Sequence, residues 1–154
     1  MKELVTDVDG VLTDGKYFYT SEGKIMKQFG PHDSDGFKII QSLGIKVRAI
    51  SADHRGFQIT KKRLDDMGIE LTLVSEDDRL EWVKSNCNIQ ETIFIGDGLH
   101  DAPVMDICGM SFAPSNALEV TKKSATHVTS SAGGNGVILE VALQLSKELN
   151  NKKI

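Results

Sequence analysis

The chain has 154 residues, of which 40% are hydrophobic, and its formal net charge at pH 7 is -4. This length and composition suit one domain with a hydrophobic core, and no linker rich in proline, glycine or serine divides the chain. The mild negative charge, with lysine and arginine scattered along the sequence, argues against a nucleic-acid partner. No apolar run is long enough to span a membrane and the first residues do not form a signal peptide, so we expect a cytoplasmic protein without a membrane partner.

Strand-like and helix-like segments alternate along most of the chain. A buried strand over residues 4–8 is followed by segments 16–20 and 24–29, which flank a Ser21-Glu22-Gly23 turn and predict a projecting β-hairpin. The next helix is expected to have Ser34 as its N-cap and to end before Gly44. Further strands are predicted over 46–50, 70–74, 92–95 and 110–113, and further helices over 57–67, 78–86, 103–108 and 137–149. The alternation predicts a single Rossmann-like α/β domain with a mostly parallel sheet and helices on both faces.

Two carboxylates, Asp7 and Asp9, lie where the first strand runs into the turn at Gly10. Ligands of open α/β sheets bind beyond the carboxyl ends of the strands. A carboxylate there can attack phosphorus, and a neighbouring one can move a proton to the leaving oxygen and then from the attacking water. Carboxylates so close repel each other unless a cation joins them, and Mg²⁺ is the natural candidate. The alternative is an acidic turn without a chemical role.

A second acidic strand end has the same design. Gly96 and Asp97 follow the strand over 92–95, and Asp101 comes four residues after Asp97. If this strand is a neighbour of the first, Asp97 can supply a carboxylate to a cation held by Asp7 and by the backbone carbonyl of Asp9. Asp101 would then orient this shell or bind through water. Two such strand ends in one short chain favour a phosphoryl-transfer site over an acidic turn.

The segment Asp7-Val8-Asp9-Gly10-Val11 resembles the first motif of the haloacid dehalogenase superfamily of phosphatases, and Gly96-Asp97 with Asp101 resembles its fourth. More narrowly, the chain is similar to the capless subfamily of 3-deoxy-D-manno-octulosonate 8-phosphate and nonulosonate 9-phosphate phosphatases. That subfamily includes the C-terminal domain of some acylneuraminate cytidylyltransferases. The segments that carry this narrower resemblance are residues 7–15, Lys27-Gln28-Phe29, Asp35-Gly36, Pro103-Val104-Met105 and Gly133-Gly134-Asn135-Gly136.

The resemblance implies a role for each matching residue. Asp7 would be the nucleophile and Asp9 the general acid/base, and Asp7, the Asp9 carbonyl and Asp97 would hold Mg²⁺. Ser51 is similar to the second motif, in which a hydroxyl and the following amides, here beginning with Ala52, grip the phosphate. Ser51 could equally be an N-cap, and the two roles are compatible. Asp35 is a further candidate for substrate binding.

The chain departs from the family pattern at the third motif. The family has a lysine near the start of a helix that neutralises the nucleophile and the phosphate, whereas the matching segment here offers Arg79. Arginine keeps the charge, but its planar fork replaces a compact ammonium, so the exchange is not conservative at a tight site. Lys84 is a weaker candidate for the same role.

The chain also departs from the pattern after Ser51. The subfamily usually continues with Gly-Arg, but this chain has Ala52-Asp53-His54-Arg55. Asp53 would repel a phosphate unless it points away, and Arg55 could serve in place of the family's arginine. His100 stands where the family often has asparagine; it could contact the substrate or simply be exposed.

Only the hairpin region, residues 16–29, lies between the first motif and the first helix, so there is no room for a cap domain. The resemblance implies that hairpins of several copies associate into a homotetramer in which a neighbouring subunit completes the pocket. Tyr17, Phe18, Tyr19 and Phe29 could support that contact or pack on their own domain.

These observations predict a Mg²⁺-dependent phosphomonoesterase that acts on a small-molecule sugar phosphate. The resemblance points to the terminal phosphate of an acidic keto-sugar, an octulosonate or a nonulosonate. The main alternative is a catalytically weak, phosphatase-like oligomerisation module associated with a sugar-acid cytidylyltransferase. A phosphomutase is poorly suited to an open site, and a response-regulator receiver would need its acceptor at a middle strand, where Ser51 stands.

Overall fold

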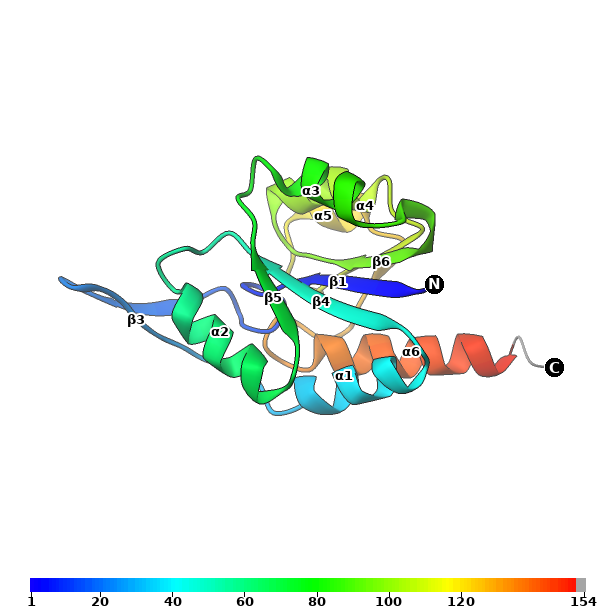
Figure 1. Ribbon diagram of the computed structural model, residues 1–154, viewed down its shortest axis with the longest axis horizontal. Helices are drawn as coiled ribbons and strands as arrows, with labels where there is room; N and C mark the ends of the chain where they lie inside the picture. The colour runs from blue at the N-terminus through cyan, green and yellow to red at the C-terminus, as the bar shows by residue number, and fades with distance from the viewer. Residues whose placement is uncertain (152–154) are drawn as a thin grey trace.

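The computed structural model describes residues 1–151 and the side chains of residues 1–149. Its centre is a six-stranded sheet in the order β5-β4-β1-β6-β7-β8, in which every neighbouring pair of strands is parallel (Figure 1). The strands are β1 (Glu3–Asp7), β4 (Lys46–Ser51), β5 (Glu70–Leu73), β6 (Thr92–Ile95), β7 (Met110–Ala113) and β8 (His127–Val128). The predicted parallel α/β sheet is therefore confirmed, with β1 and β6 side by side.

Helices cover both faces of this sheet, as predicted. Figure 1 shows α1, α2 and α6 on one side and α3, α4 and α5 on the other. Successive strand residues point to opposite faces, so Leu4 of β1 joins the core under α1 and α6 while Val5 joins the core under α3 and α4. The helices are α1 (Asp33–Ser42), α2 (Phe57–Asp66), α3 (Arg79–Asn86), α4 (Ala102–Met105), α5 (Glu119–Ser124) and α6 (Val137–Asn151). None of the helices within residues 1–151 is long and apolar enough to cross a lipid bilayer.

The hairpin is a separate two-stranded sheet made of β2 (Tyr17–Thr20) and β3 (Gly23–Lys27). It extends away from the main sheet next to α2 (Figure 1), which confirms the predicted projection. Within the described residues, this hairpin is the only regular secondary structure between β1 and α1, as expected for a domain without an inserted cap.

Three local predictions need correction. Ser34 is not an N-cap, because α1 begins one residue earlier, at Asp33, with His32 at the cap position and no side-chain cap hydrogen bond. The helix predicted over 103–108 is the shorter α4, which begins at Ala102 and has Pro103 in its first turn, where the missing N–H is tolerated. Neither α5 nor β8 was predicted, because elements of six and two residues are too short to give a clear hydrophobic period.

Candidate active site

The two acidic strand ends meet at the carboxyl edge of the sheet. β1 pairs with β6 so that Thr6 lies opposite Ile95, and the chain then continues into Asp7 on one strand and Gly96-Asp97 on the other. One carboxylate oxygen from each of Asp7, Asp97 and Asp101 lies within 4.8 Å of the other two. These three side chains offer only oxygen ligands, which Mg²⁺ prefers, so the cluster fits a divalent cation of that kind.

Gly10 allows this close approach. Its φ of +94° is rarely adopted by residues with a side chain, and a Cβ on Gly10 would collide with the carboxylate of Asp97. The loop after β1 is held by a hydrogen bond from the Leu12 N–H to the Val8 carbonyl, at 2.9 Å. Gly134 donates its N–H to the Val11 carbonyl, also at 2.9 Å, so the glycine-rich segment packs directly on the first motif.

Arg79 lies inside the acidic cluster. Its side chain is buried, one guanidinium nitrogen donates to Oδ1 of Asp101, and the other lies 3.3 Å from Oδ1 of Asp7. The other oxygen of Asp101 accepts the N–H groups of Asp97 and Gly98, both at 2.9 Å. Asp101 is therefore fully engaged, and it orients both Arg79 and the loop that carries Asp97. Lys84, by contrast, is exposed and pairs with Glu81 on the surface of α3.

Burial is the main influence on the pKa values of Asp7 and Asp97. It raises the pKa of Asp7 well above its usual range, Arg79 acts in the opposite direction, and the neighbouring carboxylates raise the pKa further. Burial, with the charge of Asp101, raises the pKa of Asp97 to about 6. Burial alone would lower the pKa of Arg79, but the Asp7 and Asp101 carboxylates raise it above its usual value. One guanidinium thus does not offset three carboxylates, and a bound cation would complete the neutralisation.

Asp9 has two side-chain partners outside this cluster. Its Oδ1 lies 2.7 Å from Nζ of Lys27, and its Oδ2 accepts a hydrogen bond of 3.4 Å from the Ser51 hydroxyl. Ser51 is fully buried at the end of β4. The N-cap alternative for Ser51 is wrong, because the N-cap of α2 is Gly56. The hydroxyl of Ser51 instead accepts the Asp53 N–H at 3.1 Å.

Asp53 does not leave an uncompensated negative charge in the site. It lies 2.7 Å from Nζ of both Lys24 and Lys27, and it accepts the Gly56 N–H at 3.0 Å. Burial alone would raise the pKa of Asp53, but the hydrogen bonds from the two lysines lower it far below its usual value. Neither lysine was predicted from the sequence as a site residue. The only hint was that Lys27 belongs to a segment that carries the family resemblance.

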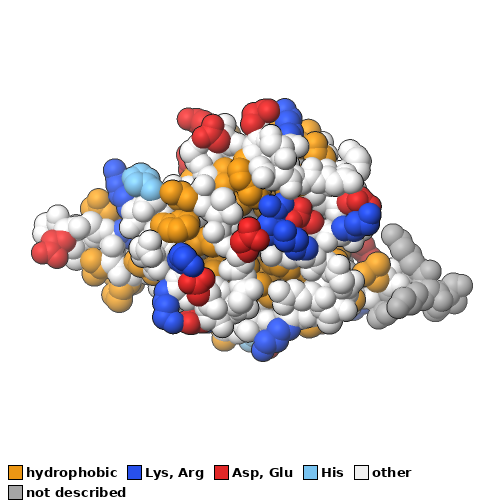
Figure 2. Space-filling view, viewed as in Figure 1, with side chains coloured by type: hydrophobic (Ala, Val, Ile, Leu, Met, Phe, Trp, Pro, Cys, Tyr) orange, Lys and Arg blue, Asp and Glu red, His pale blue; other side chains and the backbone are white. Residues whose placement is uncertain are grey.

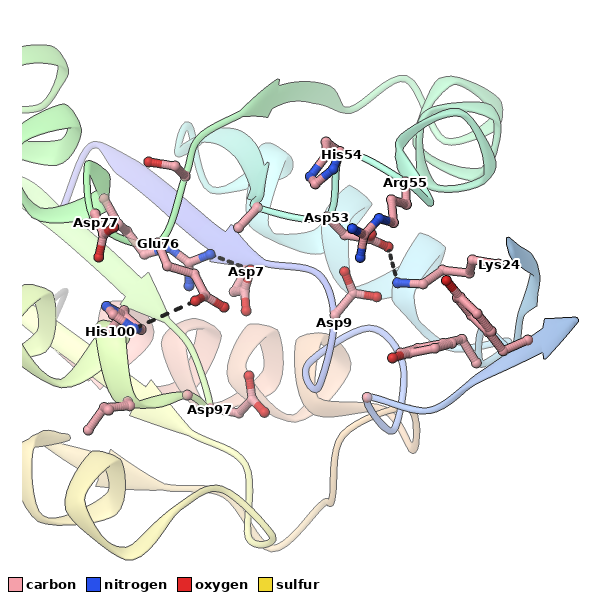
Figure 3. Close-up of a pocket in the computed structure, with 18 residues that line it drawn as sticks. Asp7, Asp9, Lys24, Asp53, His54, Arg55, Glu76, Asp77, Asp97 and His100 are labelled. Atoms are coloured by element: carbon pink, nitrogen blue, oxygen red, sulfur yellow. Dashed lines mark hydrogen bonds and ion pairs between the residues drawn. The ribbon is translucent and has the colours of Figure 1, made fainter. Parts of the chain in front are cut away.

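A cavity of about 680 Å³ opens above these groups. Figure 3 shows Lys24, His54 and Arg55 on the side formed by the hairpin and the loop before α2, and Glu76, Asp77 and His100 on the opposite side. Ala52 also lines the cavity, and Asp7, Asp9 and Asp97 form its floor. The wall near the hairpin is therefore the more basic one, which suits an anionic ligand.

Known proteins are similar to this chain in sequence and in fold. A model of the haloacid dehalogenase-like hydrolase family matches residues 82–141. A 3-deoxy-D-manno-octulosonate 8-phosphate phosphatase from Haemophilus influenzae is 33% identical over 147 residues, which are 92% of this chain and 81% of that protein. The chain belongs to this family of haloacid dehalogenase-like phosphatases.

Solved structures of family members have the same fold. The cobalt-bound phosphatase from Haemophilus influenzae superposes with a TM-score of 0.84 at 32% identity, covering 96% of this chain and 88% of that one. The Moraxella catarrhalis phosphatase, in complex with a magnesium ion, a phosphate ion and 3-deoxy-D-manno-octulosonate, gives a TM-score of 0.87 at 28% identity, covering 98% and 88%.

In this phosphatase, the predicted site residue Asp35 lies away from the other site residues. Asp35 is on α1 with a side chain that is 68% exposed, near Lys38, and it does not line the cavity. The reason is helical geometry: Phe37 and Ile40 turn one face of α1 toward the core, so Asp35 faces solvent. His100 does line the cavity, 3.6 Å from Glu76, and is partly exposed.

Proposed function

We propose that this phosphatase is a Mg²⁺-dependent phosphomonoesterase that removes the terminal phosphate of an acidic keto-sugar, 3-deoxy-D-manno-octulosonate 8-phosphate or a nonulosonate 9-phosphate. The observation that supports it most is the convergence of Asp7, Asp97 and Asp101, with Asp9 beside them at the cavity floor. The relatives are named as octulosonate 8-phosphate phosphatases, which supports the octulosonate ester as the substrate. The basic wall near the hairpin suits an anionic sugar.

The reaction would proceed in two displacements at phosphorus. The Asp7 carboxylate attacks the phosphorus, the bond to the sugar oxygen breaks, and Asp9 gives its proton to that oxygen. Asp9 then takes a proton from water, whose oxygen attacks the aspartyl phosphate and restores the Asp7 carboxylate as phosphate leaves. Asp7, Asp97 and the Asp9 carbonyl would hold Mg²⁺, which would offset the charge of the carboxylates and the phosphate.

The neighbouring residues would bind the rest of the ester. Arg79 already reaches Asp7, so it can contact a phosphate there, beside the hydroxyl of Ser51 and the backbone of Ala52. Arg55, on the basic wall, would bind the sugar or its carboxylate. A weak oligomerisation module is not favoured, because the arginine that replaces the family lysine reaches the nucleophile in this chain.

The hairpin would join copies of the chain into a homotetramer whose neighbouring subunits complete the pocket. Figure 2 shows apolar side chains along the projecting hairpin. The aromatic residues Tyr17, Phe18 and Tyr19 are 50%, 60% and 61% exposed, and Ile25 and Met26 are exposed beside them. Phe29 differs, because it packs partly against the core of its own domain. Exposed apolar patches of this kind often mark interfaces. A cytoplasmic location remains a prediction from the sequence.

A panel of sugar phosphates, assayed for inorganic phosphate with and without Mg²⁺, tests the proposal. We expect turnover of the octulosonate or nonulosonate ester in Mg²⁺ only, and none from Asp7→Asn, which keeps the fold but lacks the nucleophile. Turnover by Asp7→Asn near the wild-type rate, or equal turnover in a chelator, would contradict the assignment. Light scattering at several protein concentrations, on the wild type and on Phe18→Ser, tests the tetramer.

A further inference from the structure

Lys27 is a buried lysine that reaches the proposed acid/base from the hairpin. Its side chain has no solvent exposure, although β3, which it ends, is otherwise largely on the surface. Its Nζ lies 2.7 Å from Oδ1 of Asp9, 2.7 Å from Oδ2 of Asp53 and 2.9 Å from Oγ1 of Thr60. The ammonium therefore has three oxygen partners: a hydroxyl that accepts a hydrogen bond and two carboxylates at ion-pair distance.

These three oxygen partners hold the Lys27 ammonium in one position. Asp9 follows β1, Asp53 follows β4 and Thr60 lies on α2, so three separate segments converge on one nitrogen. A charge this deeply buried is costly unless it is paired, and this ammonium has two carboxylate partners and one hydrogen-bonded hydroxyl. Lys24, three residues earlier on β3, binds the same Asp53 oxygen but has no contact with Asp9 at ion-pair distance. Lys27 is therefore the lysine that links the hairpin to Asp9.

The contact also distinguishes the two oxygens of Asp9. Oδ1 forms the ion pair with Lys27, whereas Oδ2 has only the long contact of 3.4 Å with the Ser51 hydroxyl. The Asp9 side chain is 29% exposed and lines the cavity, so Oδ2 is the oxygen available to carry a transferable proton. A proton donor is effective only when it is held at a fixed position relative to the leaving oxygen.

We propose that Lys27 is a positioning residue for Asp9: it holds Oδ1 so that Oδ2 faces the leaving group of the bound phosphate ester. This inference rests on the proposed function. It gives the hairpin a chemical role within its own subunit, separate from any role in assembly. Asp53 and Thr60 contribute indirectly, because they hold the Lys27 ammonium, which in turn holds Asp9.

Two esters of similar size that differ in their leaving groups test this role. Benzyl phosphate releases a strongly basic alkoxide that needs a proton, and 4-nitrophenyl phosphate releases a weakly basic phenolate that does not. We expect Lys27→Met to lower kcat/KM for benzyl phosphate ~100-fold, within the range for lost general-acid catalysis, and that for 4-nitrophenyl phosphate less than about 5-fold. Lys61→Met is the matched control, since Lys61 lies next to Thr60 on α2 but forms an exposed ion pair with Asp65, and it should change neither value.

A double mutant separates positioning from general damage. In an Asp9→Asn background, Lys27→Met should leave the ratio of the two kcat/KM values unchanged within about twofold, because the group on which it acts is gone. If Lys27→Met does not fold, Thr60→Val, which removes one of the three acceptors, should show the same preferential loss on a smaller scale. Equal losses for both esters, in Lys27→Met or in its substitute, overturn the inference. A wild type that releases no phosphate in Mg²⁺ from these esters or from the sugar phosphates overturns the proposed function as well, so the two failures are distinguishable.

Discussion

Replacing Arg79 with methionine should destabilise the fold, because it leaves the buried carboxylates of Asp7 and Asp101 without their positively charged partner. Arg79 is 4% exposed and contacts both Asp101 and Asp7. Each hydrogen bond to a charged partner contributes roughly 1.5–3 kcal/mol, and removing one side of a buried ion pair costs about 3–5 kcal/mol. Protonation of Asp97, whose pKa is already about 6, offsets part of this cost. We therefore expect a loss of about 3 kcal/mol at pH 7.5 without Mg²⁺.

Urea unfolding followed by tryptophan fluorescence measures this loss. The single tryptophan, Trp82, lies on α3 with Arg79 and packs partly against the core, so it reports on the affected region. A domain of this size loses ~2–4 °C of Tm per kcal/mol, so the expected shift is about 6–12 °C. Mg²⁺ should reduce the loss, because the cation would neutralise the same carboxylates.

Lys84→Met is the control for this experiment. It removes a positive charge from the same helix, but Lys84 forms an exposed pair with Glu81, and such pairs contribute about 0–1 kcal/mol. If Arg79→Met lowers the free energy of unfolding no more than Lys84→Met does, the buried guanidinium does not neutralise the acidic cluster. The interpretation that Arg79 takes the place of the family lysine is then refuted.

Two further predictions concern buried carboxylates. Burial raises the pKa of Asp33 from 3.8 to about 6, so the fold loses up to about 3 kcal/mol as pH rises from about 4 to about 6 and the loss persists above that. Asp33→Asn should therefore be more stable than the wild type at pH 8 but nearly equal at pH 4, and a urea midpoint difference that is the same at both pH values would contradict this. Mg²⁺ at about 100 times its Kd should stabilise the wild type by ~2.7 kcal/mol in a thermal scan, and Asp97→Asn should lose most of that gain. Equal gains in both proteins would exclude Asp97 as a ligand.

Local pattern was enough to predict the acidic strand ends. Asp7 with Asp9, and Asp97 with Asp101, each follow an apolar strand and accompany a glycine, and parallel strands carry such ends to the same edge of a sheet. The parallel sheet and the hairpin could be predicted in the same way, because hydrophobic period and turn composition are properties of short stretches of chain.

The charge partners of those acids depended on the tertiary structure. Lys27 meets Asp9, and Lys24 meets Asp53 across 29 positions of the chain, so no local pattern could pair them. The same holds for Arg79, which lies 72 residues from Asp7 and was predicted only through the family resemblance. Asp35 lies away from the site because the opposite face of α1 packs on the core, so Asp35 faces solvent. Side-chain ion pairs form between segments that folding brings together, and their partners are therefore fixed by packing rather than by sequence spacing.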